Sequence, residues 1–193
     1  MTIFDGFISR DSSATCQHYL QTYRFQSGQA HYQFDYASRY QFTEPCELTS
    51  NVQPSVQLAP EKGFGKFCIA VKEGEKLLAK VNRTKITDAA GNTLAKIYDP
   101  TSWYKAVIRN ILQGDPEHFQ IRAVKGKTVL ADIIEPRRKS RWPWPLSIIA
   151  ALLSLFKSAD KSPRLKVVIH SPDIDPRVIL VAATLLDSQK GSV

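Results

Sequence analysis

Hydrophobic and polar residues alternate along several short stretches of the chain. In the clearest one, aromatic residues occupy every second position and polar residues lie between them: Tyr32, Phe34 and Tyr36, followed by Tyr40 and Phe42. A period of two is typical of one face of a β-strand. Such a face usually packs into a core, and that interpretation is favoured here. An aromatic surface for a sugar or a base is the alternative.

Three pairs of strands joined by turns are predicted in the middle of the chain: 64–71 with 76–81, 85–88 with 93–98, and 119–124 with 128–134. The second and third pairs resemble each other. ITDAAGNTLAKIYDP begins at Ile86 and IRAVKGKTVLADIIEP begins at Ile121, and seven residues, Ile, Gly, Thr, Leu, Ala, Ile and Pro, recur in the same order. A repeated hairpin indicates a barrel or sandwich built from similar units. Chance similarity between two amphipathic hairpins is the other explanation.

The pattern is less decisive elsewhere. Residues 12–25 fit a helix or a strand equally well. Residues 45–63 hold Pro45, Pro54, Pro60 and Gly63, and they predict a loop or linker. Between the two similar hairpins, Ser102 is a candidate cap for a short helix whose apolar face includes Trp103, Val107 and Ile111.

A different pattern marks the C-terminal part of the chain. Asp175 is a suitable N-cap and Pro176 suits the first position of a helix. Residues 178–186 that follow have no polar stripe, so a helix here must be buried on every side. It is far shorter than the roughly 20 residues that span a bilayer. We therefore predict a mainly β fold, a closed β-barrel around a buried hydrophobic C-terminal helix.

The stretch SPDIDPRVILVAATLLDSQ resembles the C-terminal end of the tubby-like superfamily, which includes phospholipid scramblases and plant LURP-one-related proteins. Matching features are a proline, an acidic-apolar-acidic step, an apolar helix and a closing aspartate, here Pro172, Asp173, Ile174, Asp175 and Asp187. The hairpin from Thr87 to Leu94, with Gly91 at its turn, is similar to a hairpin that recurs in the family. The resemblance covers about residues 64–189 and implies a tubby-like barrel, with residues 1–60 as a further N-terminal part of a single domain, 1–193.

The chain also departs from that family. Scramblases continue after the closing aspartate as a longer hydrophobic anchor, whereas six residues follow Asp187 here, and no acidic run forms a calcium loop. Calcium-activated scrambling is therefore not expected. The resemblance implies a lipid-binding or membrane-surface-binding module.

Residues 136–162 form a basic and apolar insertion. The order within it is cationic, aromatic, apolar and cationic, which matches a membrane interface. The candidate membrane-binding and lipid-binding residues are Arg137, Arg138, Lys139, Arg141, Trp142, Trp144, Leu152, Leu153 and Phe156. Fifteen uncharged residues, 142–156, favour dipping into one leaflet over crossing the bilayer. Docking of the 142–156 helix on a protein partner, or packing of this helix in the core, are the alternatives.

The charge distribution points to the same segment. The chain has a net charge of +8, of which residues 136–162 carry +5 while residues 1–60 carry −2. This favours a localised anionic partner. An anionic phospholipid surface is expected, and nucleic acid is disfavoured because the basic cluster precedes an apolar helix instead of alternating with stacking aromatics. The unpaired cysteines Cys16, Cys46 and Cys68 and the absence of a signal-like start favour a cytoplasmic protein, peripheral to the membrane.

No catalytic or metal-binding motif is present in the sequence. GxSxG, HExxH, a P-loop and a GxGxxG after a strand are all missing. The histidines His18, His31, His118 and His170 lie far apart in sequence, and Asp173 and Asp175 are better explained as helix caps than as cation ligands. We expect a non-enzymatic binding module without cofactor or metal.

Overall fold

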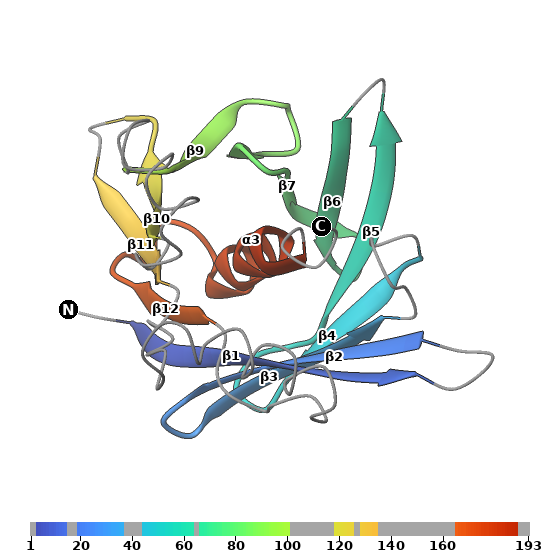
Figure 1. Cartoon of the computed structure of the whole chain (residues 1–193). Helices are drawn as coiled ribbons and strands as arrows, with labels where there is room; N and C mark the ends of the chain where they lie inside the picture. The colour runs from blue at the N-terminus through green and yellow to red at the C-terminus, as the bar shows by residue number, and fades with distance from the viewer. Residues whose placement is uncertain are drawn as a thin grey trace, which may run out of the picture.

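The computed structural model describes residues 3–14, 19–36, 44–63, 66–100, 118–125, 128–134 and 165–188. In this part of the chain, twelve antiparallel strands close into one barrel around a single helix (Figure 1). The strands are β1 (Phe4–Ala14), β2 (Tyr19–Ser27), β3 (Ala30–Tyr36), β4 (Cys46–Ser50), β5 (Val56–Gly63), β6 (Lys66–Glu73), β7 (Lys76–Val81), β8 (Lys85–Thr87), β9 (Thr93–Tyr98), β10 (His118–Ala123), β11 (Val129–Ile134) and β12 (Leu165–Ile169). Each strand pairs with its sequence neighbours, and β12 returns to pair with β1. The predicted mainly β barrel is confirmed.

Helix α3 (Pro176–Ser188) lies inside the ring of strands (Figure 1). From Val178 to Leu185 each residue is at most 3% exposed, as the apolar sequence requires. The helix begins where the sequence predicts: the Arg177 backbone N–H donates to Asp175 Oδ1 at 2.9 Å, so Asp175 is the N-cap. The prediction of a buried helix inside a closed barrel is therefore confirmed.

Inward-facing aromatics of the first strands pack beside this helix. Tyr23 and Phe34 stack with ring centroids 5.2 Å apart, and Phe25 and Phe34 with centroids 5.9 Å apart. Tyr32 is 5% exposed and Phe34 is 1% exposed, so the alternating aromatics face the core, as predicted. The side chain of Tyr36, and residues Tyr40 and Phe42, lie outside the described part of the chain.

Arg177 locks the start of α3 to the barrel. Its side chain is buried and forms ion pairs with Glu73 and Asp175, each at 2.6 Å, while Nη1 donates to the Pro54 carbonyl at 2.7 Å. The hydrogen bonds that the Arg177 guanidinium donates to Asp175 and to Glu73 raise the pKa of Arg177 further above its ordinary value despite burial. The guanidinium therefore stays charged and joins the helix to β6 and to the turn after β4.

The antiparallel order places alternate connections at opposite rims of the barrel. The connections that follow even-numbered strands, together with the start of α3, define the turn rim: 28–29, 51–55, 74–75, 88–92, 124–128 and 170–175. The connections that follow odd-numbered strands define the insertion rim: 15–18, 37–45, 64–65, 82–84, 99–117 and 135–164. The two longest connections therefore belong to the same rim.

The three predicted hairpins are present, and two of them share a structural signature. In β8 and β9, Ile86 pairs with Ala95, and the register shifts directly after Ile86. In β10 and β11, Ile121 pairs with Ala131, and the register shifts directly after Ile121. All four of these side chains are fully buried. The sequence similarity of the two hairpins is thus matched by equivalent pairing and an equivalent bulge.

The prediction of a loop over residues 45–63 is wrong, because this stretch contains β4 and β5. Leu48, Val56 and Leu58 alternate into the core and are at most 1% exposed. Pro60 is tolerated because β4 pairs with β5 no further than Leu58, so Pro60 lies where β6 is the partner. The undecided stretch 12–25 contributes strands, the end of β1 and most of β2.

Gly6 marks a close approach between β1 and β2. A Cβ atom at this position would overlap the backbone carbonyl of Gln26, and Ser27 Oγ here bridges both the N–H and the carbonyl of Asp5. Because the obstacle is backbone, it cannot move aside cheaply. We expect Gly6→Ala to lower the free energy of unfolding by roughly 1–3 kcal/mol in a urea titration. Gly91→Ala is the comparison for backbone strain without a clash, because a Cβ there meets nothing within 4 Å but φ is +86°.

Candidate functional site

The predicted membrane-binding residues all belong to the connection between β11 and β12. Arg137, Arg138, Lys139, Arg141, Trp142, Trp144, Leu152, Leu153 and Phe156 lie outside the described residues, as does the short helix predicted after Ser102. The strands at both ends of this connection are described. Ile134 at the end of β11 pairs with Lys166 near the start of β12. The 30 residues of 135–164 therefore leave and re-enter the barrel at neighbouring points of the insertion rim.

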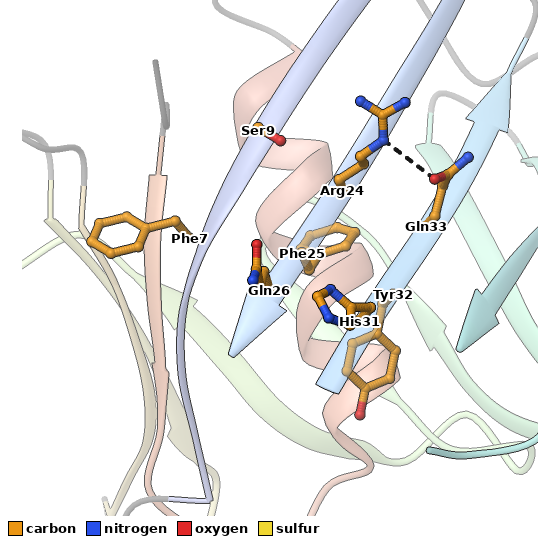
Figure 2. A pocket seen from close by; sticks show the side chains of 8 residues that line it. All are labelled: Phe7, Ser9, Arg24, Phe25, Gln26, His31, Tyr32 and Gln33. Carbon is orange, nitrogen blue, oxygen red and sulfur yellow. Dashed lines mark hydrogen bonds between the residues drawn. The ribbon is translucent and has the colours of Figure 1, made fainter. Parts of the chain in front are cut away.

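A depression of about 520 Å³ lies on the outer wall over β1, β2 and β3 (Figure 2). Its outward-facing residues form two cross-strand rows, Phe7 with Gln26 and His31, and Ser9 with Arg24 and Gln33. Buried Phe25 and Tyr32 complete the lining. Arg24 Nε donates to Gln33 Oε1 at 3.3 Å, as the dashed line in Figure 2 marks.

The side chains that line this depression are suited to binding a polar group. Two amides, an imidazole and a guanidinium offer hydrogen bonds, and Phe7, 46% exposed, adds an apolar edge. Among the described residues, no hydrogen bond joins Ser9 to His31 or to any other base. These lining groups could hold a small polar ligand by hydrogen bonds.

A second polar cluster, on β10, β11 and the end of β12, was not predicted from the sequence. His118 Nε2 lies 2.6 Å from one oxygen of Asp132, and His170 Nε2 lies 2.7 Å from the other. Gln120 Nε2 donates to the same carboxylate at 3.1 Å. His118 and His170 therefore contact the same carboxylate from either side of β11. Strand pairing brings them together, and their spacing in sequence carries no signal of it.

The Asp132 cluster links stability to pH. Partial burial acts to raise the pKa of Asp132, but the bonds from His170, His118 and Gln120 outweigh it and lower the pKa below the ordinary value. Because the folded-state pKa is the lower one, the stabilisation is complete above the unfolded value, about 3.9, and is lost as pH falls through the folded value.

We expect Asp132→Asn to lower the free energy of unfolding by about 1–2 kcal/mol at pH 7. The cost should shrink between about pH 5 and pH 2 in urea titrations, and a cost independent of pH would contradict this account.

The remaining candidate groups are structural in this part of the molecule. The Cys46 and Cys68 thiols are free, and burial raises the pKa of Cys46 to about 12, which makes it a poor nucleophile. Asp175 caps α3, as predicted. Within the described ranges, no group of three His, Cys, Asp or Glu side chains is arranged to hold a metal ion.

Comparison with known proteins adds no relative to this description. No family model, no curated protein and no solved structure matches the chain.

Proposed function

We propose that this protein is a non-enzymatic module that binds the surface of anionic phospholipid membranes, with the insertion rim towards the bilayer. The resemblance of SPDIDPRVILVAATLLDSQ to the tubby-like superfamily supports a lipid-related role. The basic, aromatic and apolar order within residues 136–162 supports peripheral contact with anionic lipid. On this proposal the protein works at the cytoplasmic face of a membrane.

One observation carries the proposal, the place of residues 135–164 in the topology. The connection joins two strands that already pair with each other, from Ala131 with Ile169 to Ile134 with Lys166. A turn of two to five residues would suffice to join such neighbours. Thirty residues are far more than closure of the barrel requires, and a long connection of this kind commonly carries function.

The charges of the connections differ between the two rims. Those at the insertion rim contain eleven Lys and Arg residues and six Asp and Glu residues in the sequence. Those at the turn rim contain two basic and four acidic residues. Attraction to an anionic surface therefore favours one orientation of the barrel, with the insertion rim towards the lipid.

The filled interior argues against a core role for the 142–156 segment. The space enclosed by the described strands is occupied by α3, whose residues 178–185 are buried on all sides. A second apolar helix in the same interior would have to displace it, at a cost of many kilocalories. This supports membrane contact or docking on a protein partner as the role of this segment. Among the described residues, no helix is both long and apolar enough to span a bilayer.

Co-sedimentation of the full chain with vesicles tests the proposal. We expect binding to vesicles of phosphatidylcholine with phosphatidylserine, weakening as salt rises because the headgroup attraction is screened. Pure phosphatidylcholine vesicles are the control. A protein that stays in the supernatant with both vesicle types at low salt would refute the membrane role.

A further inference from the structure

Three cationic side chains form one row across the outer wall of the barrel. Lys85 on β8 pairs directly with Lys96 on β9, and Lys96 pairs directly with Arg122 on β10. The residues beside them in sequence, Ile86, Ala95 and Ile121, are fully buried, so the row faces outward. Like charges directly opposite one another on neighbouring strands are destabilising. The row therefore carries a repulsion that a bound anion would relieve.

No carboxylate among the described residues neutralises this row. Within the described residues, no ion pair joins Lys85, Lys96 or Arg122 to an acidic side chain. Acidic groups on nearby strands have other partners, as Asp88 accepts from both nitrogens of Asn92 and Glu61 pairs with Lys80 at 2.7 Å. Asp132 is held by the two histidines described above.

Arg122 is held in a fixed position within the row. Its Nε and Nη2 donate to Gln120 Oε1 at 3.0 and 2.6 Å, and its Cζ lies 4.4 Å from the centroid of the Tyr98 ring. These contacts leave Nη1 without a partner among the described residues. A guanidinium held in place loses little entropy on binding, and its Nη1 offers N–H donors to a phosphate oxygen.

We propose that Lys85, Lys96 and Arg122 form a phosphate-binding row. Phosphate is favoured over a carboxylate because it presents several oxygens and up to two charges to three cations at once. β8 begins at the insertion rim, directly after the 82–84 connection with its exposed Arg83. A lipid phosphate is therefore one source of the group, which rests on the proposed membrane function, and a soluble phosphate compound is the other, which does not.

Amide chemical shifts of the full chain, titrated with inorganic phosphate and with glycerol 3-phosphate, test the row. We expect saturable shifts centred on Lys85, Lys96 and Arg122. The double variant Lys85→Gln/Lys96→Gln should weaken binding roughly five- to thirtyfold. The matched control is Lys80→Gln/Lys166→Gln, which removes the same charge from lysines that already pair with Glu61 and Asp5, and it should bind phosphate like the wild type.

Thermal melting separates a binding role from a structural one. The row variant should melt at or above the wild-type temperature in phosphate-free buffer, because repulsion is removed, and phosphate should raise its melting temperature less than that of the wild type.

Absence of saturable chemical-shift changes, or equal weakening of phosphate binding in the control variant, would overturn the proposed site. If the protein binds inorganic phosphate but not vesicles, the row is a site for a soluble phosphate compound, and the proposed membrane function is rejected. Weaker vesicle binding in the row variant, with the control unchanged, would identify lipid as the source.

Discussion

Leu180→Asp should greatly lower the free energy of unfolding of this protein. Leu180 is fully buried in α3, and strands enclose that helix on all sides. A carboxylate placed there has no partner and must either stay charged in the core or take up a proton. We expect a loss of at least about 3–5 kcal/mol, a large part of the 5–15 kcal/mol that stabilises a typical domain. Circular dichroism melting and a urea titration measure the effect.

A matched control for this substitution is Leu94→Asp on β9. Leu94 faces outward and is 38% exposed, so an aspartate there keeps its hydration and should cost less than about 1 kcal/mol. If the two variants melt alike, the helix is not the centre of the fold. Leu180→Ala adds a graded test, since a buried leucine truncated to alanine costs about 2–5 kcal/mol through the cavity it leaves.

Neutralising the basic residues of the insertion should almost abolish vesicle binding at low salt. Near an anionic surface each Lys or Arg contributes about 1 kcal/mol, so replacing Arg137, Arg138, Lys139 and Arg141 with Gln should weaken binding by roughly a thousandfold and flatten its salt dependence. Leu152→Ser/Leu153→Ser should weaken binding at every salt concentration, because apolar burial is not screened. Co-sedimentation across a salt series measures both effects.

The control for charge removes four lysines from the other side of the barrel. Replacing Lys72, Lys76, Lys125 and Lys127 with Gln lowers the net charge equally but acts at or beside the turn rim, so vesicle binding should fall far less. If both sets weaken binding alike, net charge and not the insertion governs it. A wild type that ignores vesicles, with a Leu152→Ser/Leu153→Ser variant that changes oligomeric state, would instead identify the helix as a protein-docking element.

Most of the insertion can be deleted without removing any described strand of the barrel. Because Ile134 pairs with Lys166, residues 136–164 can be replaced by Asn-Gly, leaving Glu135 opposite Leu165 across a two-residue hairpin turn. We expect this variant to fold, since no described strand is removed, and to lose vesicle binding. It should still bind inorganic phosphate through the Lys85–Lys96–Arg122 row.

The parts of the fold that were predictable from the sequence are those set by local pattern. The all-apolar run after Asp175 requires burial on every side, which almost dictates a helix inside a closed shell. The glycine turns, with φ of +58° at Gly74 and +86° at Gly91, likewise identify two of the hairpins. By contrast, whether Pro60 breaks a strand depends on which neighbour pairs with it, and that is decided by β4 ending its contacts at Leu58.

The candidate sites on the outer wall of the barrel could not be predicted from the sequence for the same reason. Asp132 and His170 are 38 positions apart, and they meet because β11 lies beside β12. Lys85, Lys96 and Arg122 become a row through the register of β8, β9 and β10. A one-residue change of register would turn the side chains of a strand to its other face, so charge clusters of this kind require the paired structure.

The order of elements along the chain has a consequence for how the protein folds during synthesis. The helix that fills the barrel is the last described element, and the strands that close it, β1 and β12, are the first and last strands. When synthesis has reached only β11, neither the β1–β12 pairing nor helix α3 can form. The apolar inner faces of the strands therefore stay uncovered. Because the β1–β12 pairing joins residues far apart in sequence, closure of the barrel is slow, and the open chain is prone to aggregate. Efficient production should thus depend on chaperones that hold the chain until α3 has emerged.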